Sequence, residues 1–393
     1  MLESAIPAHL RQERTQPARA PSSGLQQPAY PSYSARFPTS AKDLVMAVIG
    51  VQYASKSDAE ADVETGAGIS KLMSFTKHTS SSSSSPTAAP SFAELASATD
   101  SRGFFNVAVL AYWTSRATYD AWAAASGFDV WWASLDRPQD EAEEEQGRKG
   151  GGGGDGDTNG ETRRGWFREV FFPSMDRLET IFTDDQVPEG AGHLGVGSIS
   201  GPVREHGYWG SMRDRLPIAQ TDALAGEKWT GGGTEVGGAE RCSRVRVPGK
   251  KNLAIIRSGQ DWSATRSEER TLYLETMHPV LARGMGFLRD RGGEVGCYSC
   301  RFMDVVGEDD QNNDSTDRTF GLAYFDELAS LEAWSREHQT HLDIFRGFFR
   351  YARSLDNSIG LRLFHEVLVL EPEQQLFEYI GCHGGTGMLA SLA

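Results

Sequence analysis

The feature that most limits the fold of this chain is the alternation of strand-like and helical segments. Strand-like runs, rich in β-branched and aromatic residues, occupy residues 44–51, 106–113, 166–172, 252–257, 297–305, 319–325 and 361–370. Helical periodicity lies among them, over residues 115–125, 267–288, 327–337 and 342–355. This order predicts an α+β protein, and 393 residues are enough to enclose a sizeable ligand.

A short internal repeat supports this fold class. Residues 110–122 align without gaps with residues 322–334, and both copies are predicted as strand, turn and helix. True duplication predicts two ferredoxin-like halves whose sheets face each other or close into a barrel, and chance likeness is the alternative. Seven residues beyond the repeat stands His341 in the second copy but Asp129 in the first. Imidazole chemistry is therefore expected in the second half alone.

Polar segments interrupt the pattern and are predicted to be surface loops. They are the serine run at residues 80–85, the Glu-rich and then Gly-rich stretch at 138–163, and the Asp/Asn run after Gly307. Residues 1–40 are rich in Pro, Ser, Ala and Gln and predict a flexible or surface-wrapping arm. We therefore divide the chain into this arm, a first half over residues 41–200 and a second half over residues 201–393.

The charge balance limits the partners. The chain carries 54 acidic residues against 39 Lys and Arg, a formal net charge of −15. Nucleic acid and anionic membrane surfaces repel such a chain when it lacks a basic patch, so a small neutral substrate is favoured. No window approaches about eighteen uninterrupted apolar residues, and no basic segment followed by an apolar one opens the sequence. We expect no membrane span, no secretory signal and a cytoplasmic protein.

The four cysteines are too few for a disulfide scaffold at this length. Cys297 and Cys300 form a CxxC pair without a second pair to complete a zinc site. Strand alternation would direct their side chains to opposite faces, so we interpret both as structural thiols rather than a redox pair.

Three of the nine histidines, His338, His341 and His365, lie late in the chain. Thr340 is predicted to cap the following helix, which sets His341 in its first turn at the head of a Phe-rich stripe. An imidazole bordering an apolar surface suits an axial ligand of haem, and a capping or core histidine is the other interpretation.

His365 interrupts the apolar face of a predicted strand. It is either a hydrogen-bonded structural residue or a catalytic one, and the spacing leaves both open. Glu366 points to the other face and is not expected to pair with it. Ser258 lacks the glycine two positions before it that a hydrolase elbow requires, so a hydrolase triad is not predicted.

Several segments taken together resemble the haem-containing aldoxime dehydratases, in particular the phenylacetaldoxime dehydratase type. They are HGYWGSMRDRLP at residues 206–217, NLAIIRSGQDWS at 252–263, HQTHLDIF at 338–345, LRLFHEVLVL at 361–370 and FEYIGCH at 377–383. The resemblance covers roughly residues 165–390. The arm and the polar insertions have no counterpart in it.

The resemblance implies a lyase that removes water from an aldoxime, R–CH=N–OH, to leave a nitrile, R–C≡N. It implies haem b, ferrous in the active form, bound in the C-terminal half of the chain. The two ferredoxin-like halves would form a dimeric α/β-barrel-like core, and the protein would be a homodimer. The matching proximal ligand is the second histidine of the HQTH segment, His341, and His338 is the alternative. The substrate nitrogen would coordinate the ferrous iron.

The resemblance also implies the catalytic residues. His365 matches the distal histidine and would donate and then accept a proton. Ser258 and Arg213 match the serine and arginine of the family, Arg215 is the alternative arginine, and Glu179 matches a supporting glutamate less specifically. The rival interpretations are a haem peroxidase or chlorite-dismutase-like enzyme and a non-catalytic haem sensor. The aromatic-rich segments favour arylacetaldoximes or alkyl aldoximes over small polar ones.

Overall fold

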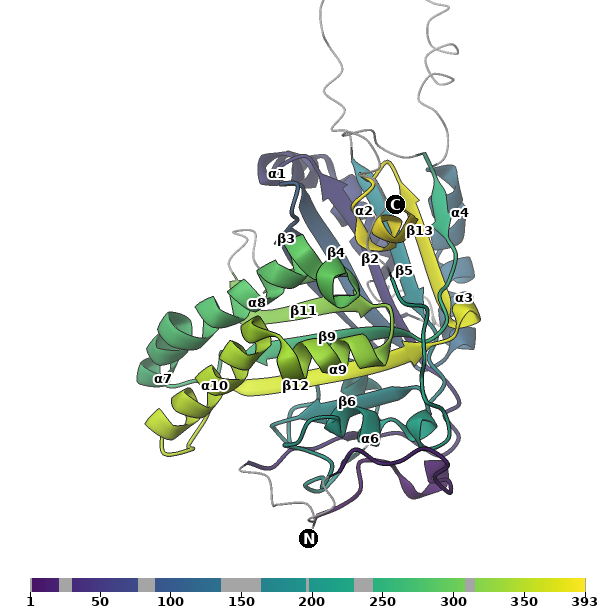
Figure 1. Ribbon diagram of the computed structural model, residues 1–393. Helices are drawn as coiled ribbons and strands as arrows, with labels where there is room; N and C mark the ends of the chain where they lie inside the picture. The colour runs from purple at the N-terminus through teal and green to yellow at the C-terminus, as the bar shows by residue number, and fades with distance from the viewer. Residues whose placement is uncertain are drawn as a thin grey trace, which may run out of the picture.

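A computed structural model describes residues 2–20, 30–76, 89–135, 164–195, 198–229, 243–307 and 315–392. In this part of the chain, helices and strands combine around one curled antiparallel sheet of eleven strands (Figure 1). All seven predicted strands and all four predicted helices are confirmed. The predicted serine-rich, Glu/Gly-rich and Asp/Asn loops, and Cys242, lie outside the described residues.

Each half of the chain runs strand, helices, strand, strand, helices, strand. The first half consists of β2 (Val45–Tyr53), α1 (Lys56–Thr65), α2 (Gly68–Thr76), β3 (Phe92–Thr99), β4 (Phe105–Trp113), α3 (Arg116–Ala125), α4 (Phe128–Ser134) and β5 (Gly165–Phe171). The second consists of β9 (Leu253–Asp261), α7 (Ser267–Leu272), α8 (His278–Arg291), β10 (Cys297–Val306), β11 (Ser315–Phe325), α9 (Leu328–Glu337), α10 (Gln339–Ser354) and β12 (Arg362–Leu370).

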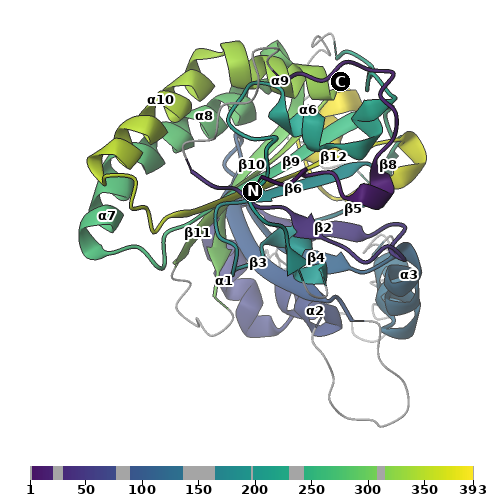
Figure 2. The same ribbon diagram turned by 90° about the horizontal axis from the view of Figure 1, so that it is seen from below.

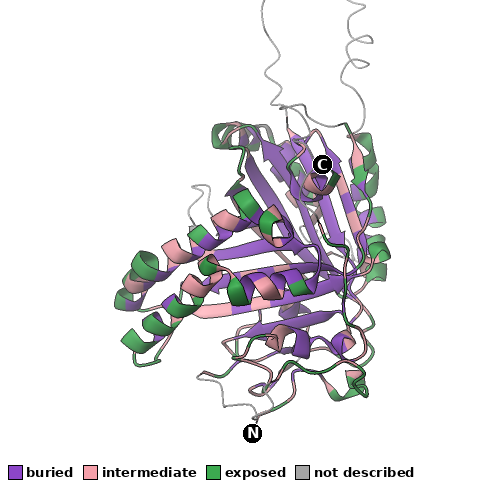
Figure 3. Cartoon of the chain, in the orientation of Figure 1, coloured by how far each residue is buried: buried purple, intermediate pink, exposed green. Residues whose placement is uncertain are grey.

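The strand order in the sheet is β6-β12-β9-β11-β10-β3-β4-β2-β5-β13-β8. Within each half the strands therefore lie in the order fourth, first, third, second, counted along the chain. The halves meet where β10 pairs with β3, with Asp304 opposite Ser97. Figure 2 shows α8, α9 and α10 on one side of the sheet and α1, α2 and α3 on the other. The strands are buried and the outer helix faces are exposed (Figure 3).

The outer strands do not follow the expected division at residue 200. Strand β6 (Leu178–Phe182) belongs to the first half by sequence but pairs with β12 of the second. Strand β13 (Gln375–Ile380) belongs to the second half but pairs with β5 of the first, and β8 (Val245–Val247) lies outside β13. The two halves therefore exchange strands at both ends of the sheet.

Strand register makes the two halves equivalent residue by residue. In the first half, Glu169 on β5 pairs with Val48 on β2, which pairs with Leu110 on β4. In the second half, Glu366 on β12 pairs with Arg257 on β9, which pairs with Leu322 on β11, the repeat partner of Leu110. The sheet curls so that each glutamate meets the third strand of the other half. Tyr112 donates a hydrogen bond to Glu366, and its repeat partner Tyr324 donates one to Glu169.

These two tyrosine contacts predict matched losses of stability. In Tyr112→Phe, the buried Glu366 carboxyl loses a donor, which we expect to lower the free energy of unfolding by about 1–3 kcal/mol. Tyr324→Phe, at the equivalent position, should cost a similar amount because Glu169 is equally buried. Urea denaturation of both variants measures this. Unfolding midpoints equal to wild type would contradict it.

The N-terminal arm lies along the β6 end of the sheet where it is described. Strand β1 (Ala35–Arg36) pairs with β7 (Ser198–Ile199), Glu3 bridges to Val203, and Tyr33 bridges to Phe182. Residues 2–20 and 30–40 thus wrap the surface. In the described ranges no helix is long and apolar enough to cross a membrane.

The CxxC pair differs from the expectation in one respect. A register shift between Cys297 and Ser299 breaks the strand alternation, and both cysteines pack in the same hydrophobic cluster rather than on opposite faces. Both are buried free thiols. Burial raises the pKa of Cys300 to about 12, so the reactive thiolate is suppressed.

Candidate active site

Two of the predicted site residues, Ser258 and His365, lie on the side of the sheet that faces α8 and α9. Ser258 on β9 lies directly opposite His365 on β12 and opposite Gly321 on β11, so the three form a row across the strands. Val367, two residues along the same face, packs with Leu281, Met285, Leu331 and Trp334 of the helices. The row therefore lies between the sheet and its helical layer.

A carboxylate and a guanidinium hold His365 from one side. Nη2 of Arg215, at the end of α6 (Ser211–Arg215), lies 2.7 Å from Nε2 of His365. Oε1 of Glu179, on β6, lies 3.0 Å from the same nitrogen. Arg215 also donates to Glu179 from Nε at 2.6 Å and from Nη2 at 3.1 Å. A guanidinium can only donate and a carboxylate can only accept, so the imidazole nitrogen has a partner in either protonation state.

The buried ion pair keeps Glu179 ionised. Burial alone would raise the pKa of this carboxyl, but the charges of Arg215 and His365 lower it to about 2. The negative charge of Glu179 in turn compensates the buried Arg215, whose side chain is 1% exposed. This cluster therefore places two compensating charges beside the imidazole of His365.

The low pKa of Glu179 predicts acid-sensitive stability. The folded pKa lies below the ordinary value of 4.5, so the stabilisation is complete above pH 4.5 and is lost as the pH falls towards 2. One pKa unit corresponds to about 1.4 kcal/mol, so we expect wild type to lose about 3 kcal/mol more than Glu179→Gln between pH 5 and pH 2. Urea unfolding across this range measures it, and parallel curves for the two proteins would refute it.

Arg213 takes a different position from Arg215. Its Nε donates to Oε1 of Glu332 at 3.0 Å and its Nη2 to Oε2 of the same glutamate at 2.8 Å. Its Nη1 donates to the backbone carbonyl of Ala223 at 2.8 Å. Arg213 is thus engaged with α9, and the structure brings Arg215, the alternative in the motif, to His365.

Helix α10 presents His341 in its first turn, as predicted, although its N-cap is His338 rather than Thr340. Nδ1 of His338 accepts from the backbone N–H of Thr340, and its ring stacks on Phe287 at 4.0 Å. Nδ1 of His341, by contrast, is buried and has no hydrogen-bond partner among the described residues. Burial lowers the pKa of His341 to about 4, so the ring is neutral near pH 7.

Aromatic rings surround His341. Its ring centroid lies 4.8 Å from Trp334 and 6.2 Å from Trp209, and Trp209 lies 4.9 Å from Phe345, one turn further along α10. Trp209 is 40% exposed, Phe345 38% and Phe349 37%. The imidazole therefore borders an apolar surface that the protein itself does not fully cover.

In the first half, larger side chains fill the position that corresponds to this row of residues. By register, the row of His365, Ser258 and Gly321 corresponds to Arg168 on β5, Ile49 on β2 and Val109 on β4. Larger side chains thus stand where the second half has a serine and a glycine. The Arg168 guanidinium lies over the rings of Phe128 and Trp132, at 5.0 and 5.9 Å from their centroids.

In the first half an ion pair also joins the helical layer to the sheet at the equivalent position. Asp129, the repeat partner of His341, lies in the first turn of α4, and its Oδ1 is 3.2 Å from Nη2 of Arg168, the register partner of His365. The helix position and the strand position therefore face each other across one layer. In the second half both positions are histidines, and no hydrogen bond joins them in the described part of the chain.

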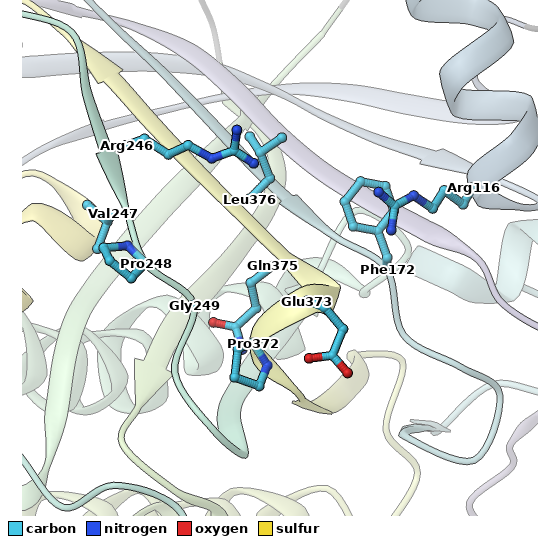
Figure 4. Close-up of a pocket in the computed structure, with 10 residues that line it drawn as sticks. All are labelled: Arg116, Phe172, Arg246, Val247, Pro248, Gly249, Pro372, Glu373, Gln375 and Leu376. Atoms are coloured by element: carbon cyan, nitrogen blue, oxygen red, sulfur yellow. The ribbon is translucent and has the colours of Figure 1, made fainter.

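Two other hollows contain no His or Ser of the predicted site. An open groove of about 370 Å³ near β8 and β13 is lined by Arg116, Phe172, Arg246 and neighbouring residues (Figure 4). A small cavity of about 40 Å³ lies beside Glu179 and Arg215, where the arm closes it with residues that include Leu10 and Phe37. The N-terminal arm thus covers the Glu179–Arg215 pair on the side where this cavity lies.

The sequence of this chain matches one protein family over most of its length. The sequence matches the haem-containing dehydratase family over residues 47–144 and 155–388. The chain belongs to this family. Haem is therefore the cofactor of this haem-containing dehydratase, and the mixed fold and curled sheet agree with the solved structures of its relatives.

Relatives of this dehydratase cover between 73% and 99% of its length. The aliphatic aldoxime dehydratase of Pseudomonas chlororaphis is 38% identical, with 99% of this chain and 98% of the relative aligned. The phenylacetaldoxime dehydratase of Bacillus sp. (strain OxB-1) is 28% identical over 73% and 74%. A crystal structure of an aldoxime dehydratase with butyraldoxime has a TM-score of 0.80 at 34% identity, covering 99% and 96%. The similarity is thus wider than the expected residues 165–390.

The residues around His341 fit a haem group. A neutral imidazole with an unpartnered buried nitrogen suits an axial ligand, and the exposed rings of Trp209, Phe345 and Phe349 suit the flat apolar macrocycle. His338 is engaged as a helix cap and fits this role less well.

Proposed function

We propose that this haem-containing dehydratase removes water from aldoximes, R–CH=N–OH, and releases nitriles, R–C≡N. The observation that carries the proposal is the position of His365 Nε2, 2.7 Å from a permanent donor and 3.0 Å from a carboxylate. A nitrogen supported both with and without its proton suits a group that must give and then take one. The names of the similar aldoxime dehydratases supply the substrate class.

Within this proposal, His341 would hold haem b and His365 would act on the substrate as acid and base. The support is the first half, where the equivalent residues Asp129 and Arg168 touch across the same layer. When bound, ferrous haem supplies an electron-rich metal centre that weakens the N–O bond of the oxime. The remaining steps fall to side chains of this chain.

Hydroxide is a poor leaving group, so the oxime oxygen must be protonated as the N–O bond breaks. Ser258, opposite His365 in the neighbouring strand, would donate a hydrogen bond to this oxygen. His365 as imidazolium would transfer its proton there, so that water departs, and as neutral imidazole would then take the C–H proton. Arg215 replaces Arg213 in our assignment: its charge would stabilise the partial negative charge that builds up on the oxygen as the N–O bond lengthens, and Glu179 would orient Arg215.

We further infer that the two halves are ferredoxin-like duplicates and that the chain forms a homodimer. The shared strand order, the repeat and the matched pairs Tyr112–Glu366 and Tyr324–Glu169 support duplication. The homodimer follows from the resemblance alone and stays a prediction that analytical ultracentrifugation measures.

The function is tested anaerobically with the haem-loaded protein. We expect dithionite-reduced protein to shift its Soret band on addition of butyraldoxime or phenylacetaldoxime and to form the corresponding nitrile. The ferric protein is the matched control and should form little nitrile. A haem spectrum without nitrile would refute the proposal, and faster turnover with peroxide than with aldoxime would favour a peroxidase.

The two neighbouring arginines give a matched pair of variants. Arg215→Ala should lower kcat/KM for butyraldoxime by about 10²-fold, because it removes the charge that contacts the proposed acid–base residue His365. Arg213→Ala should leave kcat/KM within about threefold of wild type and lower thermal stability, because it breaks the buried contact with Glu332. Steady-state kinetics and thermal melts check both predictions. If Arg213→Ala lowers kcat/KM more than Arg215→Ala does, Arg213 is the arginine of the site.

A further inference from the structure

A third histidine, His206, lies beside the charged cluster and takes no part in the steps described above. It directly follows Glu205, whose backbone carbonyl accepts a hydrogen bond from Nη1 of Arg215 at 2.8 Å. The charges of Arg215, His365 and Glu179 all reach its ring. Burial, followed by the charge of Arg215, lowers the pKa of His206 to about 3, so this imidazole is neutral near pH 7.

Tyr30 of the N-terminal arm lies between His206 and helix α10. The ring of Tyr30 meets His206 edge-on with centroids 5.0 Å apart, and meets Phe348 with centroids 5.4 Å apart. Phe348 follows His341 by seven residues, two helical turns, so the two share a face of α10. His206 therefore stands between the Arg215 cluster and the helix that presents His341.

One atom of His206 lacks a partner there. Nε2 is buried, and none of the described residues forms a hydrogen bond with it. A buried polar nitrogen left unpaired is costly, and in a native protein it commonly pairs with a water or a ligand. His206 thus offers an unpaired acceptor on a residue that lies between the Arg215 cluster and helix α10.

We propose that Nε2 of His206 accepts a hydrogen bond from the aldoxime hydroxyl and so orients it for proton transfer. An O–H group has one hydrogen to donate and two lone pairs that accept. Ser258 and protonated His365 would occupy the lone pairs, and His206 would take the hydrogen. The inference rests on the proposed function and assigns a substrate-positioning residue to that site.

Two replacements separate this role from packing. His206→Gln keeps a hydrogen-bonding group near the position of Nε2, whereas His206→Phe keeps an aromatic ring beside Tyr30 but removes the acceptor. We expect His206→Phe to raise KM for butyraldoxime about tenfold with a smaller change in kcat, and His206→Gln to stay within about threefold of wild type. The matched control is His193→Phe, which replaces another half-buried histidine, stacked on Phe92 at 3.8 Å. It should leave KM unchanged.

The experiment measures KM and kcat of the reduced, haem-loaded proteins, their Soret spectra and melting temperatures, and inhibition by the O-methyl ether of butyraldoxime. This ether lacks the hydroxyl hydrogen, so wild type and His206→Phe should bind it equally. An unchanged KM in His206→Phe, or an equal loss of affinity for the oxime and its ether, would overturn the role of His206. Absence of nitrile from wild type would instead overturn the proposed function.

Discussion

Replacing His341 by alanine is expected to give a folded protein that no longer retains haem. His341 offers a neutral, buried imidazole with an unpartnered nitrogen next to exposed aromatic rings. Loss of an outer-shell partner of a metal ligand typically costs 10–100-fold in affinity, so loss of the ligand itself should cost about 10²-fold or more. Haem titration followed by the Soret band, with circular dichroism to confirm folding, measures this.

His338→Ala is the matched control for the ligand assignment. His338 caps α10 and stacks on Phe287, so its loss should lower stability while haem binding and the Soret spectrum stay as in wild type. If His341→Ala retains haem with normal ligation and His338→Ala does not, the assignment is reversed.

Replacing His365 by alanine should spare haem and remove catalysis. His365 is the one histidine in contact with both Glu179 and Arg215 within the described ranges, and the proposed steps use it as acid and then as base. General acid–base catalysis contributes about 10²–10⁴-fold, and one residue serving two steps leads us to expect a loss of about 10³-fold in kcat. Nitrile formation by the reduced, haem-loaded variant checks this.

The control for His365→Ala is again His193→Phe, because His193 is a half-buried histidine outside this row of residues. It should keep the wild-type kcat and Soret spectrum. A His365→Ala protein that contains haem and retains more than about a tenth of wild-type kcat would show that another group moves the protons.

The elements with strong periodicity could be predicted from the sequence, and those without it could not. Strand β2 is a nearly continuous apolar run, β12 ends in the apolar run Val367–Leu370, and α10 carries a clear Phe-rich stripe. Strand β3, by contrast, is built largely from Ala, Ser and Thr, and β6 has only five residues, so neither stood out. Both acquire strand structure from neighbours that pair with them.

The site residues likewise could be predicted only where local sequence was sufficient. The motif containing Arg213 and Arg215 points to an arginine, but the two lie on one short helix and spacing cannot separate them. Only their partners distinguish them, because Glu332 binds Arg213 and Glu179 binds Arg215, and our proposed assignment rests on this difference. The prediction that the two CxxC thiols face apart was wrong for a similar reason, since a register shift cannot be read from residue order.

The sequence by itself determined the alternating elements, the repeat, the family motifs and the contrast of His341 with Asp129. The tertiary structure alone decided that Glu179, Arg215 and His365, from three distant segments, share one cluster, and that β6 crosses to the second half to supply the glutamate. The physical reason is that periodicity is a local property of the chain. Which side chains meet depends on strand register and on the curl of the sheet, and these are set by packing between residues far apart in sequence.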